Sequence, residues 1–212
     1  MTAGFLVVDK PAGITSHDVV SVLRAVLGIK KIGHTGTLDP FATGVLPMAI
    51  GHATRLIQFL NEDVKVYQGT IRLGQKTDTA DVDGEVIEEK PIPRLTEASV
   101  DNVLSRFLGF QNQVPPAYSA VKVDGKALYK YAREGKAVKA AARTIRIDSI
   151  DVDELTDTTI DIRVQCGPGT YVRTLAEDIA DALGTCGHLS SLRRTQSGPF
   201  SIDDSLDFET LS

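Results

Sequence analysis

Strand-like runs recur along this sequence more often than segments with helical spacing, and they constrain the fold most. Such runs are rich in β-branched and aromatic residues and end at glycine, proline, asparagine or aspartate. Asp124-Gly125, directly after the run 121–123, is a hairpin signal because this pair suits a two-residue turn. The expected strands cover residues 5–8, 45–50, 64–73, 85–88, 144–152, 158–166 and 188–195.

Helical segments are fewer and lie between these runs. Ser16 is expected to cap a helix whose apolar residues run from Val19 to Leu27, with Gly28 as its stop. Thr96 is expected to cap another helix. Further helices are expected at 53–60, 127–133 and 170–183. The predicted class is therefore α+β, with a mixed, mostly antiparallel sheet flanked by helices.

The length and composition fit one domain of catalytic size that spans residues 1–212, with 42% hydrophobic and 24% charged residues. No apolar run approaches the ~18–20 residues of a membrane helix. The first ten residues lack the basic region of a secretory signal. The two cysteines, Cys166 and Cys186, form neither a CxxC pair nor a metal-binding spacing. We therefore expect a cytoplasmic protein without a metal and with no membrane partner.

The net charge is −5, but a basic stripe between residues 122 and 146 reverses the sign locally. Only Asp124 and Glu134 offset this stripe, so it carries +6 and leaves −11 for the rest of the chain. Such a stripe is typical of a surface that follows a phosphate backbone, although a solvated helix face gives the same pattern. The basic stripe consists of Lys122, Lys126, Lys130, Arg133, Lys136, Lys139, Arg143 and Arg146.

The segment 31–44 holds three glycines and one proline among polar residues and predicts an ordered loop. Ordering such a loop costs much backbone entropy, so these loops usually bind something or cap a helix. Asp39 precedes Pro40, whose ring restricts the aspartate to an extended or turn conformation. A carboxylate on a rigid backbone suits a nucleophile or a general base. Asp-Pro is also a common start of a plain turn.

Three further groups suit a site, and two motifs fail. Arg193-Arg194, after Leu192, is a second small basic cluster. Tyr67 lies in an expected strand, either to stack on a base or as an ordinary half-buried tyrosine. Arg173 lies on the first turn of an expected helix, either to bind a carboxylate or phosphate or as a surface arginine. Residues 167–172 lack the third glycine of a dinucleotide fingerprint, and the region of 81–84 lacks two ligands of a calcium loop.

Six segments together resemble the TruB family of tRNA pseudouridine-55 synthases. They are DKPAGITS at 9–16, GHTGTLDP at 33–40 continuing to GVL at 44–46, RLGQKTDT at 72–79 with Asp81 and Gly84, PPAYSAVK at 115–122, GTYVRT at 169–174, and GHL at 187–189 leading to LRR at 192–194. The resemblance covers nearly the whole chain. It implies the pseudouridine synthase fold and an isomerase, an intramolecular transferase, that acts on a uridine in the T loop of tRNA.

The resemblance makes Asp39 the catalytic aspartate and Arg173 the arginine that pairs with it and holds it. Lys10 and Pro11 then support the loop rather than react. The reaction breaks the C1′–N1 glycosidic bond, rotates the uracil and joins C1′ to C5. It needs no external atom and no redox change, so we expect no cofactor. The carboxylate can attack as a nucleophile or remove a proton from C2′ to give a glycal, and both routes stay open.

The resemblance also implies how the base is bound. The reacting atoms are inaccessible in a stacked loop, so the uridine must be flipped out. His34 then enters the gap left in the RNA stack, and Tyr67 stacks on the flipped base. Tyr171 and Leu192 line the uridine pocket.

Length and partners follow from the same resemblance. Bacterial members commonly carry a further C-terminal RNA-binding module of the PUA type, whereas this sequence ends at Ser212, shortly after the last motif. We expect that module to be absent, either because the form is naturally short or because it was trimmed. The expected partner is the T stem-loop of tRNA, and the expected enzyme is a monomer. RNA substrates beyond tRNA stay open.

Two other functions compete with this one. A catalytically silent RNA-binding or tRNA-folding protein on the same scaffold would bind tRNA without needing Asp39. The presence of Asp39, Tyr67 and Arg173 together favours the active enzyme. A nucleotide-dependent enzyme would use residues 167–172, and the failed fingerprint disfavours it.

Overall fold

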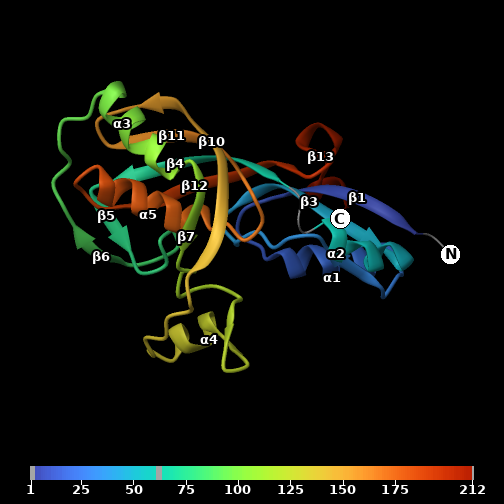
Figure 1. The fold of residues 1–212 in the computed structure, drawn as a ribbon. Helices are drawn as coiled ribbons and strands as arrows, with labels where there is room; N and C mark the ends of the chain where they lie inside the picture. The colour runs from blue at the N-terminus through green and yellow to red at the C-terminus, as the bar shows by residue number, and fades with distance from the viewer. Residues whose placement is uncertain (1–2, 61–63, 212) are drawn as a thin grey trace. The chain divides into compact units, whose positions relative to one another are not determined.

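The computed structural model describes residues 3–60 and 64–211 of the chain (Figure 1). The chain forms two compact units: unit 1 comprises Met1–Gln68 and Leu192–Ser212, and unit 2 comprises Gly69–Ser191. Strands β4 (Lys65–Leu73) and β12 (Gly187–Ser197) each run from one unit into the other. Each unit therefore contains part of both strands.

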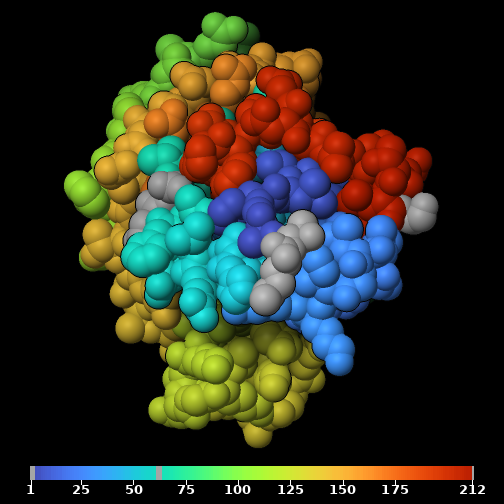
Figure 2. Space-filling view, turned by 90° about the vertical axis from the view of Figure 1, so that its right-hand side faces the viewer, coloured from blue at the N-terminus to red at the C-terminus, as the bar shows by residue number. Residues whose placement is uncertain are grey.

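Unit 1 carries strands in the order β14-β1-β3-β12-β4. Strands β1 and β3 are antiparallel and place Lys10 opposite Gly44, so the segment between β1 and β3, which includes α1, begins and ends near one point. Strand β14 pairs in parallel with β1, and Figure 2 shows the red C-terminal residues beside the blue first strand. The other elements of unit 1 are β1 (Gly4–Lys10), α1 (Ser16–Leu27), β2 (Ile32–His34), β3 (Thr43–Ile50), η1 (Gly51–Leu56), α2 (Ile57–Leu60), β13 (Phe200–Ser201), η3 (Ile202–Asp204), β14 (Leu206–Asp207) and η4 (Phe208–Leu211).

Helix α1 begins one residue earlier than the sequence predicts. Thr15, not Ser16, is the N-cap: its hydroxyl accepts a hydrogen bond from the Asp18 amide, and the Asp18 carboxylate accepts one from the Thr15 amide. The Ser16 hydroxyl is buried and instead bonds both the amide and the carbonyl of Leu38. The expectation for Ser16 is therefore wrong, because a tertiary contact uses its hydroxyl. The helix ends at Gly28 in the left-handed conformation, as expected.

Unit 2 carries strands in the order β12-β4-β11-β10-β7, so β7 lies at the edge. Strand β10 is antiparallel to both β7 and β11. The other elements of unit 2 are β5 (Gln75–Thr77), β6 (Val86–Glu89), α3 (Glu97–Leu104), η2 (Ser105–Phe107), β7 (Gly109–Gln113), β8 (Lys122–Val123), β9 (Lys126–Ala127), α4 (Leu128–Arg133), β10 (Arg143–Leu155), β11 (Thr159–Cys166) and α5 (Val172–Ala182).

Helix α5 buries one face, and this burial fixes the rotation of the helix about its own axis. Val172, Leu175, Ala176 and Ile179 are buried at helical spacing. Burying one leucine or isoleucine side chain stabilises the fold by roughly 1.5–3 kcal/mol. The helix cannot rotate about its axis without exposing these residues. Packing therefore sets the position of Arg173, which is buried on the same turn.

The predicted hairpin is confirmed by strands β8 and β9. Asp124 and Gly125 both have a positive φ, 51° and 79°, as a type I′ turn between two short strands requires. The predicted basic helix follows as α4, and the predicted cap of α3 at Thr96 is also confirmed. The hairpin and α4 carry much of the basic stripe.

The α+β class is confirmed: most strand pairs are antiparallel, while β14 with β1 and β3 with β12 are parallel. Strands β2, β5 and β7 were not predicted, because the sequences IGH, QKT and GFQNQ lack a strand pattern. Pairing with β3, β6 and β10 holds them instead. The expected helix 53–60 is the 3₁₀ helix η1 followed by the short α2. No helix among residues 3–60 and 64–211 is long and apolar enough to cross a membrane.

Candidate active site

Asp39 begins a tight turn that is tied to the end of strand β1. The amide of Ala42 donates to the Asp39 carbonyl at 3.1 Å, which places Pro40 at the second position of the turn, where proline is favoured. The Pro40 carbonyl accepts hydrogen bonds from the Gly13 amide, at 2.9 Å, and from Lys10 Nζ, at 3.2 Å. Asp39 is half-buried. Its carboxylate thus projects from a backbone held by several hydrogen bonds.

Lys10 is fully buried, and its ammonium group ends among backbone carbonyls. Besides Pro40, Nζ donates to the carbonyls of Pro11 and Ile14, both at 2.8 Å. Burial lowers the pKa of Lys10 to about 8, and the nearby carboxylate of Asp39 opposes this shift. At neutral pH the ammonium is still mainly protonated and attracts Asp39. Lys10 therefore holds the segment after β1 and the Asp-Pro turn together.

Arg194 on β12 is a second buried cation, with only 1% of its surface exposed. Its Nε donates to the Val45 carbonyl at 2.8 Å, and its Nη2 donates to the Gly36 carbonyl at 3.1 Å. These two carbonyls lie on opposite sides of Asp39 in the sequence. One guanidinium therefore ties together both arms of the loop that carries the aspartate.

Strand β12 passes very close to this loop at Gly44. Arg194 and Gly44 are partners in the parallel pairing of β12 with β3. A Cβ atom on Gly44 would lie 2.2 Å from the Arg194 carbonyl oxygen, and the residue has a φ of 101°. Only glycine satisfies both conditions. This glycine therefore allows the close approach that places Arg194 against the loop.

His34, Tyr67 and Leu192 also lie in unit 1. His34 ends β2 and is half-buried, and its Nδ1 has no hydrogen-bond partner among the residues that the structure describes. Burial lowers the pKa of His34, and the positive charges of Arg194 and His17 lower it further, so the imidazole is neutral at pH 7. Tyr67 and Leu192 are each 8% exposed, on the neighbouring strands β4 and β12.

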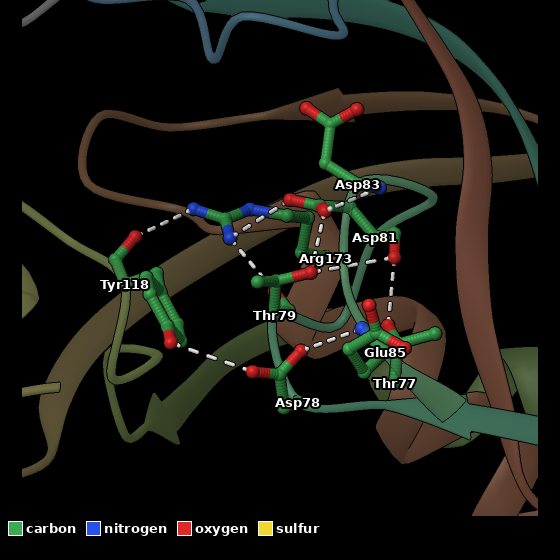
Figure 3. A network of polar contacts seen from close by, with 8 residues as sticks. All are labelled: Thr77, Asp78, Thr79, Asp81, Asp83, Glu85, Tyr118 and Arg173. Atoms are coloured by element: carbon green, nitrogen blue, oxygen red, sulfur yellow. Dashed lines mark hydrogen bonds and ion pairs between the residues drawn. The ribbon is translucent and has the colours of Figure 1, made fainter. Parts of the chain in front are cut away.

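Arg173 lies in unit 2, where a network of acceptors holds its guanidinium (Figure 3). Its Nη1 donates to the Thr79 carbonyl at 2.8 Å and to Asp81 Oδ2 at 3.1 Å. Its Nη2 donates to the Tyr118 carbonyl at 2.9 Å. Arg173 and Asp81 are only 3% and 5% exposed. The plain alternative of a surface arginine is therefore wrong.

Asp81 is fixed in turn by the loop between β5 and β6. Its Oδ1 accepts hydrogen bonds from Thr79 Oγ1 at 2.6 Å and from the Asp83 amide at 3.1 Å, as Figure 3 shows. Ala80, directly before it, has a φ of 63°, a conformation that costs a residue with a side chain of the order of 1 kcal/mol. The Ala80 carbonyl accepts from the Leu189 amide at 3.1 Å, which holds this conformation. The rejected calcium-like segment is thus an anchor for Arg173.

Tyr171 is half-buried and is the N-cap residue of α5. Its side chain makes no capping hydrogen bond within the described part of the chain; the side chain of Gln113 bonds its backbone instead. Sequence reasoning identified neither Gln113 nor Asp81 as a residue of the site. Asp81 had a signal in the sequence, since it belongs to the third resembling segment.

The six predicted site residues are divided between the units. His34, Asp39, Tyr67 and Leu192 belong to unit 1, and Tyr171 and Arg173 belong to unit 2. Within unit 1, the Lys10 ammonium is attracted by the Asp39 carboxylate and repelled by the Arg194 guanidinium. The expected pairing of Arg173 with Asp39 joins residues of different units and stays a prediction.

Comparison with known families decides the relationship. The model of the N-terminal domain of TruB family pseudouridylate synthases matches residues 24–172, which is more than half of the chain. The chain belongs to the TruB family. The model of the C-terminal domain of tRNA pseudouridylate synthase B matches residues 173–212. The resemblance seen in the six sequence segments is thereby confirmed.

Curated relatives named tRNA pseudouridine synthase B match nearly the whole chain. The protein from Psychrobacter cryohalolentis is 48% identical over 217 residues, which cover 99% of this chain and 60% of the relative. The one from Geobacter sulfurreducens is 49% identical over 208 residues, covering 98% of this chain and 68% of the relative. The chain thus spans about three fifths to two thirds of the length of these relatives.

Solved structures of other proteins share the fold. A chain in a Cbf5–Nop10–Gar1 complex aligns with a TM-score of 0.76 at 34% identity, over 97% of this chain and 52% of that one. A chain in an H/ACA RNP bound to a substrate RNA containing 2′-deoxyuridine aligns with a TM-score of 0.73 at 31% identity, over 97% and 51%. Together with the family match, these alignments confirm the pseudouridine synthase fold.

Proposed function

We propose that this protein isomerises uridine to pseudouridine in the T loop of tRNA and that Asp39 is its catalytic aspartate. The observation that carries the proposal is the anchored Asp-Pro turn inside a motif of the TruB family. Lys10 bonds the carbonyl of Pro40 in this turn, and Arg194 bonds the carbonyls of Gly36 and Val45 on either side of it, so the carboxylate is positioned before any substrate binds. Relatives of similar sequence are named tRNA pseudouridine synthase B, which supports tRNA as the substrate.

The reaction is balanced within one nucleotide. The C1′–N1 bond breaks, the uracil rotates, and C5 forms a new bond to C1′. C5 then loses its proton, and N1 ends protonated, so there is no net gain or loss of atoms. Asp39 serves either as the nucleophile that holds the sugar at C1′ and is then displaced by C5, or as the base that removes the C2′ proton and returns it when C5 bonds to C1′. No cofactor takes part in either route.

The remaining site residues receive roles in binding the flipped base. The neutral His34 imidazole suits insertion into a stack of bases, because it brings no charge that must be desolvated. Tyr67 offers a ring for stacking, while Tyr171 and Leu192 provide apolar walls. The Arg173 side chain is held by Asp81 in the absence of RNA. It is the arginine that the resemblance pairs with Asp39. These contacts would hold the base while Asp39 acts.

The basic stripe gives the protein a surface for RNA phosphates. An open hollow of about 540 Å³ lies over the β8–β9 hairpin and the start of α4, and Lys122, Lys126, Lys130 and Tyr129 line it. The Arg133 guanidinium lies 5.5 Å from the centre of the Tyr129 ring. This cation–π contact covers one face of the ring and keeps the positive charge at the surface. Figure 2 shows this segment at the surface in yellow-green. The positive charges of the lysines that line this hollow favour the binding of a polyanion such as RNA.

The deciding experiment measures tritium release from tRNA labelled at C5 of uridine, because bond formation at C5 expels that hydrogen. We expect release with the wild type and none with Asp39→Asn, while both bind tRNA equally. Asp83→Asn is the matched control, since Asp83 is exposed, and it should behave as the wild type. Release by Asp39→Asn at the wild-type rate would sink the assignment. Binding without release in all variants would favour the silent RNA-binding alternative.

A second experiment tests the RNA surface. Lys130→Glu combined with Arg133→Glu should weaken tRNA binding and flatten its salt dependence, because fewer counterions are released on binding. Lys30→Glu combined with Lys31→Glu makes the same charge change at two exposed lysines of unit 1. If both double variants lost the same amount of tRNA affinity, the basic stripe would be an ordinary solvated surface and not an RNA-binding one.

The wider setting belongs to the same proposal. We place the enzyme in the cytoplasm, as a monomer, and we propose that its described residues form a catalytic domain. Tritium release by this chain alone would support the last point, because it would show that the catalytic domain suffices for turnover.

A further inference from the structure

Gln113 makes an unusual contact for a residue at the end of an edge strand. It is the last residue of β7 and is only 5% exposed. Its Oε1 accepts a hydrogen bond from the Tyr171 amide at 2.8 Å, and its Nε2 donates to the Tyr171 carbonyl at 3.1 Å. One side chain therefore bonds both polar groups of a backbone 58 residues away.

This contact sits at the start of α5. The Tyr171 carbonyl also accepts from the Leu175 amide at 3.1 Å, so it is the first hydrogen-bond acceptor of the helix. A helix start leaves backbone groups that a capping side chain usually satisfies, and Tyr171 supplies no such bond. Gln113 takes that place from a different strand. It fixes the backbone that directs the Tyr171 ring, and Arg173 follows two residues later.

We propose that Gln113 is a positioning residue for the uridine pocket, which holds the Tyr171 ring and the first turn of α5 in the geometry that the reaction needs. The inference rests on the proposed function, because the pocket is that of the flipped uridine. Gln113 touches neither the base nor the reacting atoms. It acts through the backbone of Tyr171.

The same strand offers a matched control. Gln111 lies two residues earlier, on the same face of β7. Its side-chain amide donates to the Phe107 carbonyl at 2.6 Å, a contact within its own segment. Replacing Gln111 therefore removes a glutamine and a hydrogen bond from β7 without touching α5.

The experiment compares Gln113→Leu with Gln111→Leu in single-turnover pseudouridine formation, tRNA binding and amide exchange of residues 171–175. We expect Gln113→Leu to slow turnover about 100-fold, the effect of a misplaced pocket, with tRNA affinity unchanged. Exchange at the Tyr171 amide should accelerate in this variant alone. Turnover as fast as in Gln111→Leu, or affinity lost in parallel with turnover, would overturn the proposal.

Gln113→Glu keeps the proposal testable if the leucine variant does not fold. The introduced carboxylate, when ionised, would still accept from the Tyr171 amide but would repel its carbonyl, whereas the protonated acid donates as the glutamine does. Burial should raise the pKa of this new carboxyl, so turnover relative to the wild type should recover as pH falls from about 8 to about 6. Arg143, opposite Gln113 on β10, stays charged throughout and does not cause the change. If the ratio of Gln113→Glu turnover to wild-type turnover stayed near one from about pH 8 to about pH 6, the proposal would be overturned.

Failure of the proposed function would give a different pattern. If the wild type forms no pseudouridine, the function fails, and the exchange of residues 171–175 still decides whether Gln113 holds this backbone. If the wild type is active and Gln113→Leu matches it in both turnover and exchange, only the role of Gln113 fails.

Discussion

The two units hold their candidate catalytic groups with opposite charges. In unit 1 the acid Asp39 lies in a loop whose backbone carbonyls, at Gly36, Pro40 and Val45, accept hydrogen bonds from the buried cations Lys10 and Arg194. In unit 2 the cation Arg173 is held by buried acceptors, chief among them the carboxylate of Asp81. Unit 1 thus fixes the backbone that carries an anion through cationic donors, whereas unit 2 fixes a cation through acceptors that bond its own side chain.

This difference shows how a charged site can be ordered before its substrate arrives. A buried charge without partners is very unfavourable, so each unit must compensate its own charges locally. The positive charge of Arg194 lies close enough to lower the pKa of Lys10, and the Asp39 carboxylate offsets part of that repulsion. We therefore expect the largest effect where a carboxylate partner of a buried charge is removed. Removing a cation that bonds backbone carbonyls should have a smaller effect, and removing a local helix cap should have the smallest.

The largest effect is expected at Asp81. Asp81→Ala would remove a buried carboxylate from the buried Arg173 guanidinium, which should cost about 3–5 kcal/mol of unfolding free energy. Turnover should fall about 100-fold, because Arg173 loses its fixed position. Urea unfolding and single-turnover rates measure the two effects. Asp83→Ala is the control, since only the Asp83 backbone joins the network, and equal losses would break the comparison.

Local chemistry predicted the parts of this site that depend on neighbours in sequence. The turn at Asp39 follows from Pro40, and the β8–β9 hairpin follows from Asp124-Gly125. The start of α5 was expected at residue 170, close to Val172, because its apolar spacing is regular. The family resemblance supplied the roles of the site residues, which local chemistry alone left open.

The unpredicted parts depend on partners far away in the sequence. Asp81 and Arg173 are 92 residues apart, and no local pattern reveals their pairing. Gln113 ends a strand of polar residues that has no strand signal of its own. In the sequence, Arg194 was interpreted only as part of a small basic cluster with Arg193. Its alternation with Leu192 on the buried face of β12 was the signal that it points inward.

The second effect compares these neighbouring arginines. Arg194→Met would remove the guanidinium donors from the carbonyls of Gly36 and Val45, at a cost of about 1–3 kcal/mol, and should loosen both arms of the Asp39 loop. Arg193 pairs with Asp9 at the surface, so Arg193→Met should cost about 0–1 kcal/mol. Urea unfolding of both variants checks the difference. A larger loss for Arg193→Met would contradict the role given to Arg194.

The third effect is the pH dependence of Lys10. In the folded chain Lys10 releases its proton near pH 8, and in the unfolded chain it does so near its ordinary value of 10.5. Between these values the unfolded chain binds more protons, so rising pH should stabilise the wild type relative to Lys10→Met. Turnover should fall over the same range, because the neutral amine no longer attracts Asp39.

Unfolding midpoints and single-turnover rates from pH 7 upward test both signs. Lys31→Met, at an exposed lysine, should follow the wild type throughout. If the wild type and Lys10→Met keep a constant difference in stability across the range, the shifted pKa of Lys10 is excluded.

The smallest effect is expected from a comparison of how the first turns of helices α1 and α5 are capped. Helix α1 is capped by its own Thr15 and Asp18, at the exposed surface of unit 1, whereas α5 depends on the distant Gln113. Thr15→Ala should therefore cost about 1 kcal/mol of unfolding free energy and leave turnover unchanged, because the hydrogen bonds of the cap join only Thr15 and Asp18. Gln113→Leu should instead lower turnover. If Thr15→Ala slowed turnover as much as Gln113→Leu, then any weakening of a helix start would suffice, and the special link between Gln113 and the uridine pocket would be lost.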